Sequence, residues 1–353
     1  MDENTSSSVI DSGPASGAAA TVADEFVGIP KVGEEILGGK YRIERVIGLG
    51  GMGVVAAALH QRLGHRVAIK FLSASMQTPE LVDRFLREGQ AAVRIKSEHV
   101  ASVLDVGVLD SGTPYLMMEH LIGVDLGEHL ADGGPLQIAE AVDFTIQTCE
   151  ALAAAHMAGV IHRDLKPSNL FLTQRADGTP LIKVLDFGIS KVSEAAGHPD
   201  MKSTLTRPGM MLGSPRYMSP EQLRNSSKVD HHTDIWAIGV VLHELLTGTP
   251  PFDAESFAAL CSMIISDPPV RLRARVPAAP ADLEATILRC LEKAPTDRFS
   301  NVAELAAALV PHASEEARQS ATRIRRMLGQ VPGKTPAGMY RPARATSRRA
   351  WPR

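Results

Sequence analysis

The chain of 353 residues has few of the features that mark secreted, metal-stapled or membrane proteins. It contains only three cysteines, Cys149, Cys261 and Cys290, and no two of them have CxxC spacing. A disulfide framework or a structural zinc site is therefore not expected. The longest apolar run, near residues 235–242, is much shorter than the roughly 20 residues that cross a bilayer. Residues 1–4 also lack the pattern of a secretory signal, so we expect no membrane span and a reducing, cytoplasmic setting.

The chain also lacks a large net charge, since the formal value is −3 at pH 7. This value gives no overall electrostatic reason for binding nucleic acid or an anionic membrane, and no specific nucleic acid is predicted. The charge is nevertheless unevenly distributed, at −5 in residues 1–40 and +8 in residues 312–353. We expect residues 1–33 to be a disordered acidic arm and residues 310–353 a disordered basic tail. The tail has three further possible roles, namely docking to an acidic partner, contact with the acidic arm, and weak nucleic-acid binding.

Hydrophobic periodicity divides the intervening residues into a small β part and a larger helical part. Five β-leaning stretches predict an antiparallel sheet, at 41–48, 53–59, 66–72, 100–108 and 115–119. A helix is predicted at 79–93, with Thr78 as its N-cap. After residue 134 the period becomes helical, at 138–158, 229–246, 255–265, 280–292 and 301–309. A hairpin at 170–183 turns on Asp177 and Gly178.

A glycine-rich stretch in residues 47–55 has the spacing G-x-G-x-x-G-x-V. Such glycines let a backbone turn press its N–H groups against phosphate oxygens, because no Cβ intervenes. The same spacing occurs in ordinary tight turns and in Rossmann dinucleotide sites, which need a helix at the third glycine. Residues 54–56 instead continue as a strand, which disfavours a Rossmann site. The candidate phosphate-binding residues are Ile47, Gly48, Leu49, Gly50, Gly51, Met52 and Gly53.

A lysine closes the apolar strand pattern V-A-I-K, seventeen residues after Gly53. A lone strand lysine is usually a solvated edge residue. Following a glycine loop, Lys70 is well placed to put one cation on the α and β phosphates of a nucleotide. Glu88, in the predicted helix at 79–93, is the candidate anionic partner of Lys70. On helix spacing alone, Glu88 can equally be an exposed surface residue.

Three further motifs carry the strongest signal. H-R-D-L-K-P-S-N occupies residues 162–169, D-F-G follows at 186–188, and S-P-E at 219–221. With the glycine loop and V-A-I-K, these motifs stand in the order typical of protein kinases. Over roughly residues 41–309 the chain resembles the protein kinase family, specifically the bacterial eukaryotic-like Ser/Thr kinases. The family's closing triplet usually begins with Ala, so Ser219 is a small departure.

The resemblance implies an α+β, bilobal protein kinase fold. A small five-stranded antiparallel β lobe with one helix is expected at about 41–120, and a larger, mainly helical lobe at about 121–309. The catalytic domain as a whole is expected to span residues 34–309.

The resemblance also implies ATP and Mg²⁺ as cofactors and assigns roles to the polar residues. Asp164 is the expected base for the substrate hydroxyl, and Lys166 is expected to neutralise the transferred γ-phosphate. Asn169 and Asp186 are the expected Mg²⁺ ligands, since both offer hard oxygen atoms. Lys70 and Glu88 are expected to form an ion pair, with Phe187 beneath the helix that carries Glu88. A turn-forming role for Asp164 and Asp186 does not explain their neighbours in the motifs.

The adenine ring is expected between the two lobes. The residues that would surround it are Val55 and Ala68 above, Phe171 below, Met118 at the back, the backbones of Glu119 and Leu121 at the hinge, and Asp125 near the ribose. Aliphatic and aromatic surfaces suit a flat apolar ring. For one of the neighbouring residues Met117 and Met118, ordinary strand core is the alternative role.

Substrate class and switching are read from the same motifs. The sequence Lys166-Pro167-Ser168 resembles the Ser/Thr pattern, so the expected substrates are protein Ser and Thr hydroxyls. Thr204 and Thr206 are candidate autophosphorylation sites that would raise activity. The resemblance further implies that Glu221 and Arg298 form a buried ion pair and that Asp234 anchors the catalytic loop. The alternatives are a pseudokinase scaffold and a small-molecule phosphotransferase. The first predicts missing ATP- or metal-handling residues and the second is disfavoured by residues 219–221.

Overall fold

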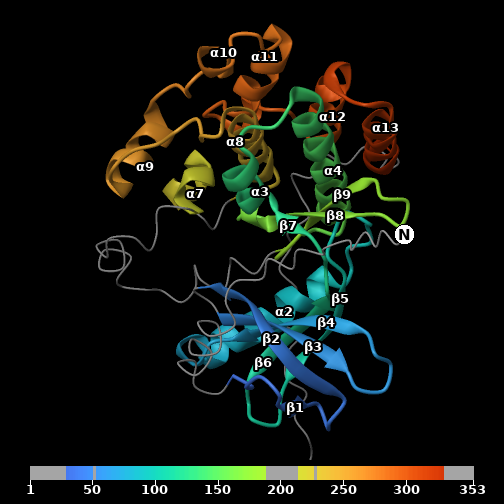
Figure 1. Cartoon of the computed structure of the whole chain (residues 1–353). Coiled ribbons are helices and arrows are strands. Elements are labelled where there is room, and N and C mark those ends of the chain that lie inside the picture. Colours follow the sequence, from blue (N-terminus) through green and yellow to red (C-terminus); the bar gives the residue numbers. More distant parts are fainter. Residues whose placement is uncertain (1–28, 51–52, 188–213, 226–228, 330–353) are drawn as a thin grey trace, which may run out of the picture.

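The computed structural model describes residues 29–50, 53–187, 214–225 and 229–329. Within these residues, a β-rich lobe and a helical lobe lie at opposite ends of the molecule (Figure 1). The bilobal α+β fold predicted from the motifs is therefore confirmed.

The β-rich lobe is built on one antiparallel sheet with the strand order β1-β2-β3-β4-β6-β5. Its strands are β1 (Glu35–Ile36), β2 (Tyr41–Gly50), β3 (Gly53–His60), β4 (Arg66–Leu72), β5 (Val103–Val108) and β6 (Pro114–Glu119). The prediction of five strands was wrong by one, because β1 pairs with the start of β2. A strand of two residues is too short to produce an alternating pattern in the sequence.

The alternation of side chains along β4 places Lys70. Val67, Ile69 and Phe71 are buried in the core on one face of the sheet. Since successive strand residues point to opposite faces, Lys70 points the other way, to the face where Leu72 packs against helix α2 (Pro79–Ala92).

Helix α2 confirms the predicted helix and its start. Thr78 accepts a hydrogen bond from the N–H of Leu81 at 3.4 Å, with Pro79 at the first helical position. A Cβ on Gly89 would lie 2.9 Å from side-chain carbons of Leu116 and Val106. The glycine thus lets α2 approach strands β5 and β6 closely, directly beside Glu88.

The helical lobe has two central helices, α4 (Ile138–Met157) and α8 (His232–Thr247), which contribute many side chains to its core. The other helices are α3 (Leu126–Gly133), α7 (Pro220–Asn225), α9 (Phe257–Ser266), α10 (Leu272–Arg275), α11 (Ala281–Cys290), α12 (Val302–Leu309) and α13 (Glu315–Gly329). The five helices predicted after residue 134 are confirmed as α4, α8, α9, α11 and α12.

The residues between the catalytic loop and Asp186 belong to a second, three-stranded sheet. It consists of β7 (Val124–Asp125), β8 (Leu170–Gln174) and β9 (Pro180–Val184), of which β8 and β9 form the predicted hairpin. Val184 also bridges Val100, in the segment between α2 and β5. Strand β9 therefore contacts a segment of the β-rich lobe just before Asp186.

Helix α13 corrects the prediction that residues 310–353 are disordered. Residues 310–312 form a 3₁₀ turn, and α13 begins after Ser314, whose Oγ accepts from the N–H of Ala317 at 3.3 Å. Ala317, Ala321 and Ile324 form a buried stripe against the lobe. Because two of the three are small alanines in a segment rich in arginine, the hydrophobic pattern is weak and the sequence analysis did not predict this helix. Residues 330–353 lie outside the described part, and an acidic partner for them stays a prediction.

Among the described residues, no helix is long and apolar enough to cross a membrane.

Candidate active site

The catalytic loop is anchored by one buried carboxylate. Asp234, in the first turn of α8, accepts the backbone N–H groups of His162 at 3.0 Å and Arg163 at 2.9 Å. Its Oδ2 also lies 2.7 Å from Nε2 of His156. Burial raises the pKa of Asp234, but these hydrogen bonds and the nearby histidines outweigh it, and the pKa is lowered overall. The predicted anchoring role of Asp234 is confirmed.

Arg163 has a positive φ of 68°, a conformation that is uncommon for a residue with a side chain. Its N–H is held by Asp234, and its carbonyl accepts from the Gln222 side chain at 2.7 Å. These contacts hold the backbone turn immediately before Asp164.

The predicted base and its neighbours meet within this loop. Lys166 Nζ donates to Asp164 Oδ2 at 2.8 Å. The side-chain amide of Asn169 donates to the carbonyl oxygen of Asp164 at 2.7 Å. The Asp164 and Lys166 side chains are partly exposed. A carboxylate and an ammonium group therefore face the same solvent-accessible space.

Lys70 forms its ion pair with Asp186 and not with Glu88. Lys70 Nζ donates to Asp186 Oδ2 at 2.7 Å, which joins β4 to the segment after β9. The predicted Lys70–Glu88 pair was therefore wrong for this arrangement, and Glu88 lies half-buried on α2. Burial raises the pKa of Asp186, but the charge and hydrogen bond of Lys70 outweigh it, so that this pKa is lowered overall.

Asn169 and Asp186 have the chemistry of a magnesium site. Asn169 uses its amide nitrogen to hold the loop, which leaves its oxygen available as a ligand. The Asp186 carboxylate accepts from Lys70 through Oδ2, and about a third of its side chain is exposed. Since Mg²⁺ prefers a few carboxylate and carbonyl oxygens together with phosphate and water, the two residues fit this ion.

Phe187 lies in the interior directly after Asp186. Its ring meets that of His162 edge-on, with centroids 4.9 Å apart. It also lines a small cavity together with Gly89 and Ala92 of α2 and with Met118. The expected packing of Phe187 near the helix that carries Glu88 is confirmed, and Met118 borders the same small cavity.

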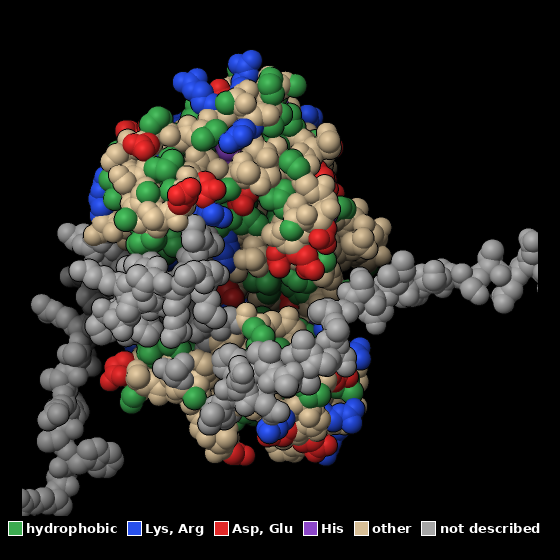
Figure 2. Space-filling view, turned by 60° about the vertical axis from the view of Figure 1, so that its left-hand side comes forward, with side chains coloured by type: hydrophobic (Ala, Val, Ile, Leu, Met, Phe, Trp, Pro, Cys, Tyr) green, Lys and Arg blue, Asp and Glu red, His purple; other side chains and the backbone are tan. Residues whose placement is uncertain are grey.

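The predicted adenine-site residues come from three neighbouring pieces of structure. Val55 pairs with Lys70 across β3 and β4, while Ala68 pairs with Met118 across β4 and β6. Phe171 on β8 pairs with Asp125 on β7. Leu121 is half-buried in the segment that follows β6. Figure 2 shows a hollow between the two lobes, with hydrophobic and charged side chains in it.

Asp125 has a structural contact besides its predicted ribose contact. Its Oδ1 accepts the N–H groups of Gly127 at 2.8 Å and Glu128 at 3.0 Å. Asp125 is therefore the N-cap of α3, a role that sequence reasoning did not assign to it.

Glu119 contributes a hinge contact that no sequence motif pointed to. Its Oε1 accepts from Lys183 Nζ and from the N–H of Ser102, both at 2.7 Å. The side chain of the hinge residue thus ties β6 to β9 and to the segment before β5.

The glycine loop is described up to its tip. Ile47 and Leu49 on β2 are exposed, Gly48 is half-buried, and Gly50 pairs with Gly53 across the hairpin. Gly53 has a φ of 156°, and a Cβ there would lie 1.8 Å from the carbonyl oxygen of Phe71. Only glycine fits this approach of β3 to β4. The predicted residues Gly51, Met52, Thr204 and Thr206 lie outside the described part of the chain.

The predicted ion pair of the helical lobe is confirmed. Arg298 donates to both oxygens of Glu221, at 2.7 and 2.8 Å, and its side chain is fully buried. It also donates to the carbonyl oxygen of His232, at the start of α8. The pair thus joins α7 to the helix that carries Asp234.

Comparison with known proteins agrees with this geometry. Residues 41–312 match the protein kinase domain family. The serine/threonine-protein kinase Pkn1 of Myxococcus xanthus is 40% identical over 288 residues, which are 81% of this chain and 40% of the relative. PknB of Mycobacterium tuberculosis, also a serine/threonine-protein kinase, is 34% identical over 278 residues, or 78% of this chain and 43% of PknB. The chain thus spans less than half the length of these relatives.

A solved structure shows the same fold. The kinase domain of PknI from Mycobacterium tuberculosis has a TM-score of 0.62 and 28% identity, and the match covers 81% of this chain and 100% of that domain. The resemblance to bacterial Ser/Thr kinases, drawn from the five ordered motifs, is therefore confirmed. The chain belongs to the protein kinase family.

Proposed function

We propose that the chain is an ATP-dependent serine/threonine protein kinase, which transfers the γ-phosphate of ATP to Ser or Thr hydroxyls of proteins. The observation that carries this proposal is the constellation of Asp164 and Lys166 on the anchored loop with the Lys70–Asp186 pair. Lys166 is near enough to Asp186 to contribute to lowering its pKa. Phosphoryl transfer depends mainly on such positioning and charge neutralisation.

The residues have separate tasks in this reaction. Asp164 orients the acceptor hydroxyl and accepts its proton, while Lys166 neutralises charge on the transferred phosphoryl group. Lys70 contacts the α and β phosphates. Asn169 and Asp186 would hold Mg²⁺, which would supply positive charge to neutralise the phosphates. The glycine loop provides backbone N–H groups, and the apolar residues Val55, Ala68 and Phe171 enclose the adenine.

The central test is phosphate transfer from radiolabelled ATP by the purified chain, with magnesium and a generic protein substrate. Asp164→Asn keeps the side-chain size and removes the base, so we expect the rate to fall by about 10²- to 10⁴-fold. Asp132→Asn, at an exposed position of α3, is the matched control and should retain full activity. A wild-type chain that binds Mg-ATP and transfers no phosphate would contradict the proposal.

That outcome would support the alternative of a catalytically impaired scaffold.

We also propose activation by autophosphorylation at Thr204 or Thr206, in a cytoplasmic setting. The support comes from the sequence, where Arg163 beside the catalytic base offers a cation for a phosphorylated segment. Pre-incubation with ATP should raise the rate of the wild type and leave the Thr204→Ala/Thr206→Ala variant at its basal rate. An equal rise in both proteins would reject these two sites.

A further inference from the structure

Helix α13 begins at Glu315, beyond the end of the family match at residue 312. It is nevertheless part of the packed molecule. Ala317, Ala321 and Ile324 are buried against the helical lobe, and α13 lies along α4 (Figure 1). The N–H of Ser314 also donates to Asp143 of α4 at 2.9 Å. The helix therefore lies outside the matched kinase domain and packs in a defined position against the helical lobe.

A buried carboxylate of α4 receives the main polar contact from α13. Arg323 donates to both oxygens of Glu150, at 2.8 and 2.9 Å. Only 10% of the Glu150 side chain is exposed. Two parallel hydrogen bonds from a guanidinium group fix both the position and the orientation of a carboxylate.

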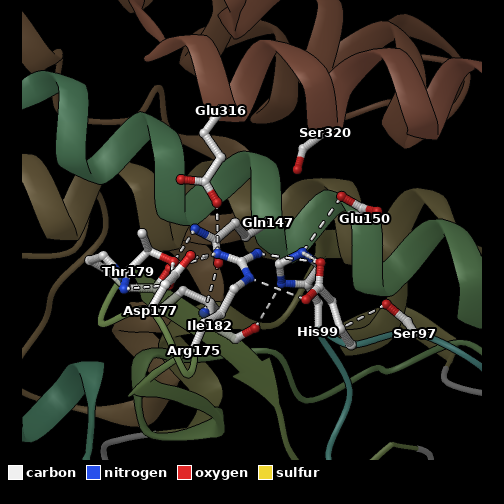
Figure 3. A network of polar contacts seen from close by, with 12 residues as sticks. Ser97, His99, Gln147, Glu150, Arg175, Asp177, Thr179, Ile182, Glu316 and Ser320 are labelled. Carbon is white, nitrogen blue, oxygen red and sulfur yellow. Dashed lines mark hydrogen bonds and ion pairs between the residues drawn. The ribbon is translucent and has the colours of Figure 1, made fainter.

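A second polar contact of α13 involves Arg175 and Glu316, which Figure 3 labels. Arg175, the residue that follows β8, donates to Glu316 of α13 at 2.7 Å and to Glu98 at 3.2 and 3.3 Å. Glu98 belongs to the segment between α2 and β5. Arg175 therefore links α13 to the segment between α2 and β5 of the β-rich lobe.

Both sets of contacts converge on His99, a fully buried residue of the same segment. Its Nε2 lies 3.6 Å from Glu150 and 3.6 Å from Glu98. Its Nδ1 lies 3.0 Å from the carbonyl oxygen of Ile182 on β9. The His99 carbonyl accepts the N–H of Val184, two residues before Asp186. His99 thus holds β9, and with it Asp186, against the segment that follows α2, the helix that carries Glu88.

We propose that Arg323 and Glu150 are positioning residues, through which docked α13 holds His99 and β9 in place and thereby sets the affinity for the Mg-nucleotide. The proposal rests on the proposed kinase function only where its test measures KM and kcat. The physical reason is that the three charged residues of the site lie on separate elements. Lys70 lies on β4, Glu88 on α2 and Asp186 after β9. His99 follows α2 in the chain and contacts β9, and so it links the second of these elements to the third.

The test compares full-length variants by Mg-ADP affinity, by kinetics and by amide hydrogen exchange. Arg323→Ala should weaken Mg-ADP binding and raise KM for ATP by about three- to tenfold, a typical size for residues along a coupling network. The kcat should change by less than about twofold, and exchange should become faster at residues 97–103 and 180–187. Arg323→Lys keeps one charged contact and should recover part of the affinity.

Two further comparisons separate a positioning role from a merely structural one. Arg326→Ala changes an exposed arginine of the same helix that forms no ion pair with any described residue, and should match the wild type. If Arg323 acts through Glu150, the Arg323→Ala/Glu150→Gln double variant should bind Mg-ADP no more weakly than Glu150→Gln alone. If Arg323→Ala does not fold, Glu316→Gln, at a half-exposed position, replaces it with a smaller expected effect.

The proposal is overturned if exchange rises only within α13 and Mg-ADP affinity stays unchanged. Failure of the proposed kinase function gives a different result. In that case no phosphate is transferred by any variant, while Mg-ADP affinity and exchange still respond to Arg323→Ala.

Discussion

The two halves of the candidate active site are held in different ways. In the helical lobe, the catalytic loop is fixed by one buried carboxylate, Asp234, which accepts several hydrogen bonds. Across the cleft, Lys70 and Asp186 are joined by one side-chain contact, and about a third of Asp186 is exposed. The difference indicates that the loop carrying the base is preformed, whereas the ion pair across the cleft is able to exchange partners.

Removing the loop anchor should have the largest effect. Asp234→Ala leaves the N–H groups of His162 and Arg163 buried without an acceptor and His156 without its carboxylate. Loss of one partner from a buried charged network destabilises by about 3–5 kcal/mol. Urea unfolding followed by circular dichroism measures the change in the free energy of unfolding.

The exposed Asp132→Ala on α3 serves as the control and should change this free energy by less than about 0.5 kcal/mol. An Asp234→Ala variant as stable as the control would refute the idea of a preformed loop.

A second buried carboxylate of the helical lobe should show itself by its pH dependence. Burial raises the pKa of Glu150, but the neighbouring His99 and the hydrogen bonds from Arg323 outweigh it and lower this pKa overall, from 4.5 to about 2. Because the folded-state pKa is below the unfolded value, the stabilisation is complete above pH 4.5 and is lost as the pH falls toward 2. The groups that face Glu150 are His99 and Arg323, with Glu98, Arg175 and Glu316 beyond them.

The measurement is the difference in unfolding free energy between wild type and Glu150→Gln. This difference should be on the order of 2 kcal/mol at pH 6 and should vanish near pH 2. Glu128→Gln, on the exposed side of α3, should give no such pH-dependent difference. A difference for Glu150→Gln that is constant from pH 6 to pH 3 would mean that the carboxylate charge does not matter there.

Sequence reasoning succeeded where a local pattern or the family resemblance identifies the role of a residue. The start of α2 followed from the cap residue Thr78, whereas the loop anchor Asp234 and the Glu221–Arg298 pair followed from the resemblance. It failed where the pattern is short or the apolar residues are small, as in β1 and α13. It also failed for the partner of Lys70. Motifs identify Glu88 and Asp186 as important residues, but the relative positions of β4, α2 and the segment after β9 decide which carboxylate pairs with Lys70.

The exchange of partners across the cleft gives the smallest expected single effect and the sharpest comparison. Asp186→Asn removes the present partner of Lys70, whose side chain is only 11% exposed. If Glu88 replaces Asp186 as the partner, unfolding free energy should fall by no more than about 1 kcal/mol, the usual size for a partly exposed ion pair. Glu88→Gln alone should have a similarly small effect, since Asp186 remains in place.

The double variant Asp186→Asn/Glu88→Gln leaves Lys70 without either carboxylate. Its loss of stability should exceed the sum of the two single losses by about 1–3 kcal/mol, since a buried ammonium group is then uncompensated. Urea unfolding of the four proteins measures this coupling directly. Strict additivity would show that Glu88 does not replace Asp186, and a single Asp186→Asn loss as large as that of Asp234→Ala would show that the two halves of the site are held equally firmly.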